Sequence, residues 1–400
     1  MATTTPATPL ALAAGRAPHW LRSEGCRLDD LVDVLRDRTE PHDYPFSTGV
    51  EREVIVYDAS QLSGIRHGDA QRPDLLAEVA RALSAGPGIV VFKRAFQEEA
   101  ADRVTAAFEV MIREQRAAGT ASGDHFARPG ANDRVWNALE KLAVTDPDAF
   151  VDYYANDVIA LASTAWLGPG YQITSQVNVV NPGGAGQTVH RDYHLGFQSD
   201  ERCALYPSHV HALSQVLTLQ GAVAHCDMPV ESGPTLYLPH SQKYAPGYVA
   251  YRRPEFQEYF AAHHVQLPLA KGDAVFFNPA LFHAAGTNHS TSIRRMANLL
   301  QVSSAFGRAM ETVDRTRVVE AVYAAVLASR DRLGSAGVAN VIAASAEGYS
   351  FPTNLDRDQP IGGLAPQTQA ELVAEAVEGR VPLAELRDRL ASQRATRQSH

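Results

Sequence analysis

The chain changes character at residues 168–192, GPGYQITSQVNVVNPGGAGQTVHRD. Before this stretch the apolar residues mostly recur at helical spacing. Tyr171 to Val180, in contrast, is a short run rich in β-branched residues, and a Gly-rich turn follows it. Further short runs of this kind follow at 215–224, 235–238, 274–277 and 296–303. Many short strands separated by turns predict a β barrel or a β sandwich.

Helical patterns lie on both sides of this β region. We expect helices at 74–85, 97–118, 135–142 and 148–167, a buried strand at 89–92 and a loop at 119–132. After Gly307 helical spacing returns, with helices expected near 310–333, 338–347, 367–378 and 383–392. The sequence therefore predicts a mainly β core with α flanks.

The composition is that of a globular chain with a large core. Of the 400 residues, 45% are hydrophobic and 20% are charged, which excludes disorder over most of the length. The formal charge of −9 argues against a nucleic-acid or membrane-surface binder. Three cysteines are too few for a disulfide framework or a thiolate zinc site, so we expect a cytoplasmic protein. No apolar run has the length of a membrane span, and residues 1–14 are interpreted as a loose tail.

Three His-x-Asp pairs occur among the 15 histidines: His67/Asp69, His190/Asp192 and His225/Asp227. On a strand, residues i and i+2 point to the same side, so such a pair can serve an iron(II) site of two His and one carboxylate. The pattern alone is weak, because about one or two matches arise by chance. Context favours the second pair, which follows a strand and a Gly-rich turn. The first is interpreted as surface loop, and the third as a strand-end His with a turn-capping Asp.

The third ligand must come from a distant strand. His283 follows the turn and strand at 272–277, and His289 is its alternative. Arg294 comes eleven residues after His283 and opens an apolar strand. Its planar guanidinium suits the far carboxylate of a keto-acid cosubstrate. Arg295 is expected to point to the opposite face as a surface charge.

Taken as an ordered set, these segments resemble the phytanoyl-CoA dioxygenase family of iron(II)/2-oxoglutarate oxygenases. The set is His190-Arg191-Asp192, the segment 231–241, His283 and Arg294, and the resemblance spans about 85–303. The chain departs from the family where the usual Pro-Gly-Ser-His turn reads Pro239-His240-Ser241-Gln242. A Ser often found two residues after the distal His is Ala285 here, so Thr287 or Thr291 is expected to assist Arg294.

The resemblance implies a double-stranded β-helix (a cupin-like jelly roll) decorated by N- and C-terminal helices. It also implies that iron(II) is held by His190, Asp192 and His283, and that Arg294 binds the distal carboxylate of 2-oxoglutarate. Further candidates are Thr188 and Gln176 for cosubstrate binding and Arg191, Tyr193 and His194 for substrate contacts. No catalytic residue is expected beyond the metal site.

The implied activity is oxidation of a small organic substrate by O2, with decarboxylation of 2-oxoglutarate to succinate and CO2. Hydroxylation or desaturation is favoured, because a halogenase relative would carry a small residue in place of Asp192. The expected division is an N-terminal extension over 1–45, the dioxygenase domain over 46–306 with its β core at 169–306, and a C-terminal helical extension over 307–400. The loop at 123–128 is a candidate lid, and the C-terminal helices a candidate surface for homo-oligomers.

Two other functions remain open from the sequence. One is a cupin-like metal isomerase or hydrolase, which would need neither Arg294 nor O2. The other is a non-catalytic ligand-binding relative that binds no iron. The substrate is not determined by these residues, although high Ala and Arg content favours a bacterial enzyme of specialised metabolism.

Overall fold

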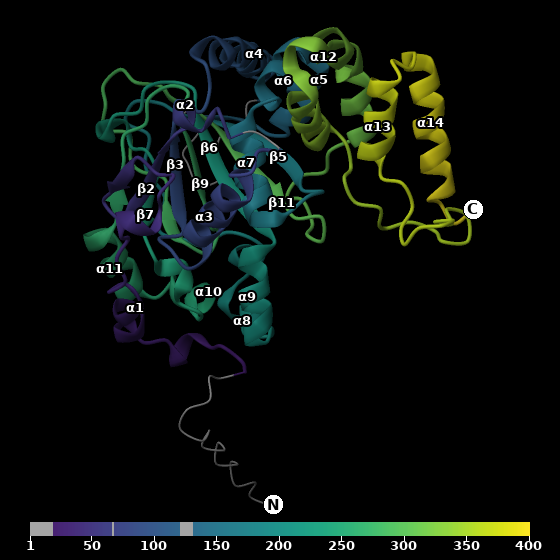
Figure 1. Ribbon diagram of the computed structural model, residues 1–400. Coiled ribbons are helices and arrows are strands. Elements are labelled where there is room, and N and C mark those ends of the chain that lie inside the picture. Colours follow the sequence, from purple (N-terminus) through teal and green to yellow (C-terminus); the bar gives the residue numbers. More distant parts are fainter. Residues whose placement is uncertain (1–18, 66–67, 121–130) are drawn as a thin grey trace, which may run out of the picture.

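The computed structural model describes residues 19–65, 68–120 and 131–400. Its centre is an eight-stranded sheet with the order β1-β2-β3-β9-β6-β11-β5-β4, and a three-stranded sheet with the order β10-β7-β8 faces it (Figure 1). The strands are β1 Gly49–Glu51, β2 Val54–Asp58, β3 Ile89–Lys93, β4 Asn132–Val135, β5 Gln172–Val180, β6 Thr218–Ala224, β7 Leu236–Leu238, β8 Val265–Gln266, β9 Ala274–Phe277, β10 Phe282–Ala284 and β11 Arg295–Ser303. Among the strands that the structure describes, only β2 and β3 pair in parallel. This arrangement is a double-stranded β-helix.

Helices cover the outer face of the large sheet and extend beyond one end of it (Figure 1). They are α1 Leu28–Val34, α2 Ala59–Leu62, α3 Arg72–Ser84, α4 Glu98–Ala117, α5 Ala138–Thr145, α6 Pro147–Tyr154, α7 Asp157–Leu167, α8 Asp200–Cys203, α9 Ser208–Val216, α10 Gly247–Ala250, α11 Pro254–His263, α12 Arg315–Ser345, α13 Gln369–Glu378 and α14 Leu383–Thr396. A kink interrupts α12 at Gly334, where φ is 66°. Within the described ranges, no helix is both long and apolar enough to span a membrane.

The large sheet separates two apolar clusters. On its outer face, Met296, Leu300 and Val302 of β11 pack in the main core with the helices. On its inner face, Ala297 and Leu299 of the same strand pack against the smaller cluster between the two sheets. Since side chains alternate along a strand, the odd-numbered residues of β11 face the interior of the barrel. The strand is thus largely buried on both faces.

The predicted fold class is confirmed, with differences in single elements. Strands β1, β2 and β4 were not predicted, and α9 was missed. β4 reads Asn-Asp-Arg-Val and lies at the sheet edge, so its polar sequence resembles a loop. The helix predicted from Met310 begins at Arg315, because the side chain of Asp314 accepts the backbone N–H of Arg317 as its N-cap. The candidate lid at 123–128 lies outside the described residues.

A buried histidine ties two helices to the sheet. His225 follows β6, with Nδ1 at 2.8 Å from Thr105 Oγ1 of α4 and Nε2 at 3.0 Å from Tyr153 Oη of α6. Burial lowers the pKa of His225 to about 4, so the ring is neutral at pH 7. Asp227 accepts the backbone N–H of Lys271, as expected of a turn-capping residue.

This histidine makes stability depend on pH. Between about pH 6.5 and pH 4, the unfolded chain binds a proton at His225 that the folded protein does not, so stability falls as the pH falls. We expect the wild type to lose about 2 kcal/mol more unfolding free energy between pH 7 and pH 5 than His225→Gln. Urea denaturation at both pH values measures this difference. His263→Gln, at an exposed histidine, is the control, and equal pH dependence in the wild type and His225→Gln would contradict the assignment.

Candidate metal centre

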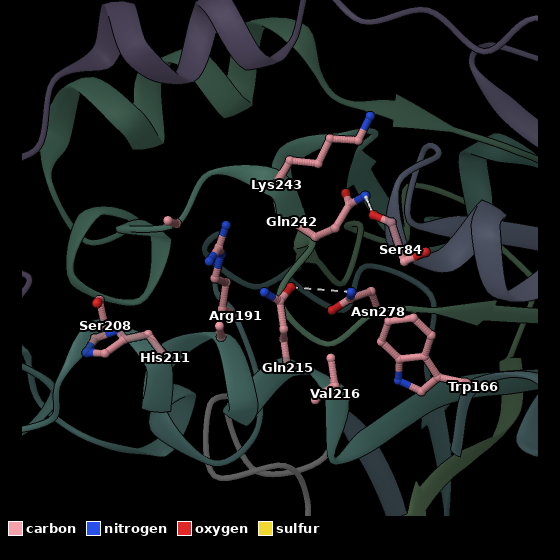
Figure 2. Close-up of a pocket in the computed structure, with 12 residues that line it drawn as sticks. Ser84, Trp166, Arg191, Ser208, His211, Gln215, Val216, Gln242, Lys243 and Asn278 are labelled. Carbon is pink, nitrogen blue, oxygen red and sulfur yellow. Dashed lines mark hydrogen bonds between the residues drawn. The ribbon is translucent and has the colours of Figure 1, made fainter. Parts of the chain in front are cut away.

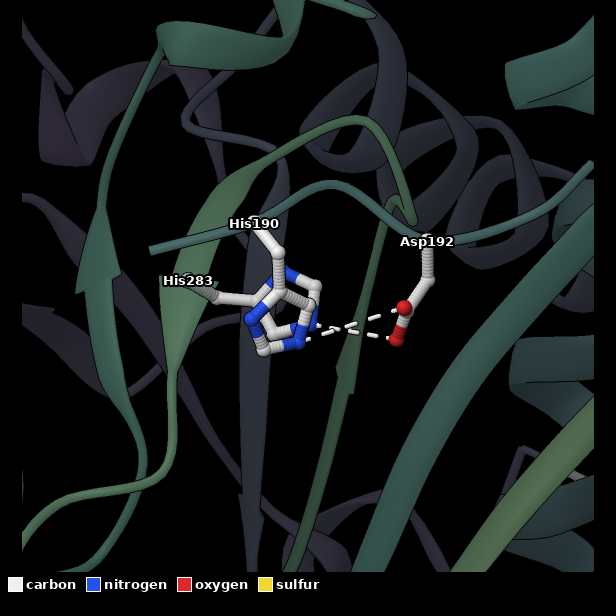
Figure 3. A group of neighbouring side chains, drawn as sticks. All are labelled: His190, Asp192 and His283. Carbon is white, nitrogen blue, oxygen red and sulfur yellow. Dashed lines mark ion pairs between the residues drawn. The ribbon is translucent and has the colours of Figure 1, made fainter. Parts of the chain in front are cut away.

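Three side chains from separate parts of the chain meet between the sheets. One potential ligand atom from each of His190, Asp192 and His283 lies within 4.8 Å of the others (Figure 3). His190 Nε2 is 3.9 Å from Asp192 Oδ1, and His283 Nε2 is 3.4 Å from Asp192 Oδ2. Reciprocal backbone hydrogen bonds between His190 and His283, of 2.9 and 3.2 Å, pair the two segments. In the described part of the chain this is the one such group of three or more His, Cys, Asp or Glu residues.

Both histidines are held in one tautomer. The Nδ1 atom of His190 is 2.8 Å from the carbonyl oxygen of Thr188, and that of His283 is 2.8 Å from the carbonyl oxygen of Leu281. A carbonyl oxygen can only accept, so each Nδ1 carries the proton. Each Nε2 therefore points toward the carboxylate and is the atom that takes up a proton or binds a metal ion, which is how second-shell contacts orient metal-ligating histidines.

Asp192 is kept ionised. Burial alone would raise its pKa, but the two histidines and a hydrogen bond from Gln220 outweigh this effect and hold the pKa well below its usual range. Gln220 Nε2 donates to Asp192 Oδ2 over 2.6 Å. This contact orients the carboxylate and leaves Oδ1 toward His190. Gln220 was not among the sequence-predicted site residues, because nothing in its sequence context distinguishes it.

The residues next to Asp192 hold the backbone around it. Arg191 is 1% exposed and donates to the carbonyl oxygens of Ser241 and Tyr244. Tyr193 has the rare φ of 36°, and its carbonyl oxygen accepts from Tyr248 Oη over 2.8 Å. These contacts fix the backbone on both sides of the carboxylate. The side chain of Arg191 is thus engaged within the chain itself.

Arg294, the predicted anchor for the cosubstrate, lies on the outer face of the sheet. It pairs with Glu109 of α4 over 2.8 Å, and 41% of its side chain is exposed. Arg295, expected on the surface, is instead 6% exposed and faces the interior. The strand begins at Arg295, and alternation along it puts only the odd positions inside.

Arg295 is a buried cation without an acidic partner. Its Nη1 donates to the carbonyl oxygens of Ser232 and Gly286, and within the described ranges no carboxylate forms an ion pair with it. Burial lowers its pKa to about 10, so it stays charged at pH 7. Tyr237 pairs with His283 across β7 and β10, and it also lies close enough to Arg295 to influence the pKa of the guanidinium. Tyr237 is thus a neighbour of both Arg295 and the candidate metal ligand His283.

The other predicted residues differ in how deeply they are buried. Gln176 is buried in the barrel, opposite Leu299, and its Nε2 lies 3.3 Å from Met310 Sδ. His194 is half-buried, and burial lowers its pKa. Side chains at the surface are those of Thr188, Thr291 and His289, so His289 does not replace His283. Thr287 Oγ1 accepts the backbone N–H of Gly186 and shapes the turn before His190.

A separate cavity of about 190 Å³ lies beside the metal-binding segment. Arg191, Gln215, Gln242 and Asn278 line it, whereas the three candidate ligands do not (Figure 2). Arg191 lies between His190 and Asp192 in the chain, so this cavity adjoins the segment that carries these two ligands.

The fold and the site together define a double-stranded β-helix protein with a site of two His and one carboxylate. The phytanoyl-CoA dioxygenase (PhyH) family model matches residues 85–296, just over half of the chain. The chain belongs to this family, whose members use iron(II), 2-oxoglutarate and O2. No curated protein matches the sequence.

Solved structures resemble this chain over part of its length. AviO1 from Streptomyces viridochromogenes Tue57 is 18% identical, with a TM-score of 0.43, over 58% of this chain and 95% of its own. The carbocyclase SnoK of nogalamycin biosynthesis is 19% identical, with a TM-score of 0.40, over 57% and 83%. The epimerase SnoN of the same biosynthesis is 17% identical, with a TM-score of 0.38, over 58% and 82%. SnoK and SnoN are non-heme, α-ketoglutarate-dependent enzymes.

The residues present fit this cofactor set. Two imidazole Nε2 atoms with fixed tautomers and one ionised carboxylate are the donor set of non-heme iron(II) sites. The buried guanidinium of Arg295 matches the distal carboxylate of 2-oxoglutarate in charge and shape.

We expect Gln220→Leu to weaken metal binding by about 10- to 100-fold, because Asp192 then loses the donor that orients it. Titration with iron(II) or cobalt(II) without oxygen measures this affinity. Gln301→Leu is the matched control, since Gln301 faces Gln220 across β6 and β11 without contacting Asp192. Equal affinities of the two variants would exclude the orienting role.

Proposed function

We propose that this protein is an Fe(II)- and 2-oxoglutarate-dependent oxygenase that hydroxylates or desaturates a small organic substrate. His190, Asp192 and His283 would hold the iron, and residues 46–306 would form the catalytic domain. The observation that carries the proposal is the convergence of these three ligands in a barrel that also contains an unpaired, inward-facing arginine.

Each residue has a definable task. The carbonyl oxygens of Thr188 and Leu281 keep the two Nε2 atoms available, and Gln220 fixes the carboxylate of Asp192. Iron bound there would supply the redox chemistry by which O2 is consumed, 2-oxoglutarate loses CO2 to give succinate, and the substrate is oxidised. Three protein ligands leave coordination positions for cosubstrates.

Arg295 would bind the distal carboxylate of 2-oxoglutarate. Its Nε and Nη2 atoms make no hydrogen bond to any residue that the structure describes, so a bidentate pair is available. A carboxylate there would also offset a buried charge that is otherwise costly. This assignment replaces Arg294 and keeps the cosubstrate inside the barrel.

A first experiment tests the metal site. Anaerobic iron(II) plus 2-oxoglutarate should give the wild type a weak visible charge-transfer band that Asp192→Ala and His283→Ala lack. His289→Ala is the matched control and should retain the band. Identical spectra for the wild type and the two ligand variants would show that these residues do not bind the iron. A cupin-like hydrolase would turn over without O2, and a binding protein would show no iron in metal analysis.

A second experiment compares the two neighbouring arginines. Arg295→Met should raise the 2-oxoglutarate requirement at least about thirtyfold, because the carboxylate loses its buried partner, while Arg294→Met should leave it unchanged. Arg295→Lys keeps the charge but loses the planar fork, so an intermediate value is expected. The 2-oxoglutarate dependence of the band gives all three values. A larger increase in the 2-oxoglutarate requirement for Arg294→Met than for Arg295→Met would identify Arg294 as the residue that binds the distal carboxylate.

A further inference from the structure

Buried oxygen atoms without hydrogen-bond donors gather on one part of the barrel interior. Gln220 Oε1, Gln301 Oε1, Asn178 Oδ1 and Glu311 Oε2 are all buried and have no partner among the described residues. Such atoms are rare in folded proteins, and a cluster of them points to a missing binding partner. All four can accept a hydrogen bond.

The strand register places three of these side chains on one wall. Gln301 lies directly opposite Gln220 of β6, and two residues along β11 from Leu299. Asn178 of β5 lies opposite Ala297 of β11. Gln176 of β5, opposite Leu299, lies between Thr174, which is opposite Gln301, and Asn178. Diagonal neighbours on one face are about 7–8 Å apart, so Gln176 joins Gln301 to Asn178 along one wall. Gln220 also contacts Asp192, which places this surface beside the candidate metal ligands.

The segment after β11 covers the wall. Met310 Sδ lies 2.9 Å from Tyr193 Oη and 3.3 Å from Gln176 Nε2. The backbone N–H of Asn137 donates to Glu311 Oε1 over 2.7 Å, which leaves Oε2 without a donor. Met310 is 39% exposed, and its side chain is unbranched and adaptable. It can leave the wall without disturbing the core.

We propose that the substrate is a polyhydroxylated small molecule that binds against this wall in place of the Met310 side chain. The proposal rests on the proposed function, since the wall adjoins the metal site. Hydroxyl groups would supply the donors that the oxygens of Gln301, Asn178 and Glu311 lack. An apolar acyl chain would leave these oxygens buried and unpaired. A substrate bound mainly through an ammonium group would need carboxylates, whereas all but one of the oxygens belong to neutral amides.

The test uses full-length protein with Zn(II) in place of iron and with 2-oxoglutarate present. Binding of methyl glucoside, myo-inositol and sucrose is compared with that of octanoyl-coenzyme A and octylamine by ligand-observed saturation-transfer NMR. We expect the polyhydroxylated probes to bind and the other two not to bind. Gln301→Met should weaken the best polyhydroxylated probe about tenfold or more, because one acceptor is lost at constant volume.

Two variants of Met310 test whether its side chain covers the wall. Met310→Ala should strengthen binding of the same probe several-fold because the covering side chain is gone, while Met310→Leu should behave as the wild type. Preference for the acyl or amine probe, no binding of any polyhydroxylated probe, or an unchanged affinity in both Gln301→Met and Met310→Ala would overturn the proposal.

The iron–2-oxoglutarate band is recorded in every variant. A normal band with failed polyol binding overturns the substrate class alone, whereas a missing band in the wild type overturns the proposed function.

Discussion

The backbone pairing of His190 with His283 is the contact on which the site depends. These residues are 93 positions apart, and two reciprocal hydrogen bonds bring their Cα atoms side by side. Because both side chains then lie on the same face of the pair, their Nε2 atoms point to one place without further adjustment. Asp192, two residues after His190, joins them when its N–H donates to the carbonyl oxygen of Pro279. A break in this pairing would separate His283 from the segment that carries His190 and Asp192.

The barrel adds the electrostatic conditions that this pairing cannot supply. An isolated carboxylate in a buried site would tend to take up a proton. Here the two imidazoles and the Gln220 amide favour the charged form, so a metal ion would meet an anionic ligand at neutral pH. The arrangement is rigid because the flanking backbone is tied down by Arg191 and Tyr248.

The sequence predicted the architecture and a set of metal-ligand candidates that the structure brings together, but it exchanged the faces that Arg294 and Arg295 occupy. The ligand candidates followed from an ordered set of motifs, and the strands that mount them are rich in β-branched residues. The choice between Arg294 and Arg295 depended on which face of β11 each occupies. An alternating pattern would have shown this, but β11 packs apolar residues on both faces and carries no such pattern. β4 was missed because its polar sequence resembles a loop. Gln220 was missed because a single polar residue in a buried strand carries no sign of a functional contact.

The two buried arginines show why position, and not burial alone, distinguishes a structural cation from a binding one. Arg191 lies between the rings of Tyr248 and Phe282, with its carbon Cζ 5.2 and 5.0 Å from their centroids, and donates to two carbonyl oxygens. Gly247 permits this placement, since a Cβ there would lie 1.8 Å from Cζ of Arg191. The chain itself therefore offsets the charge with carbonyl dipoles and aromatic faces. Arg295 likewise uses one nitrogen, Nη1, for two carbonyl contacts, but among the described residues no aromatic ring lies over its guanidinium. Because the odd-numbered residues of β11 face the interior of the barrel, Arg295 lies on the side of the sheet where we propose that the distal carboxylate of 2-oxoglutarate binds.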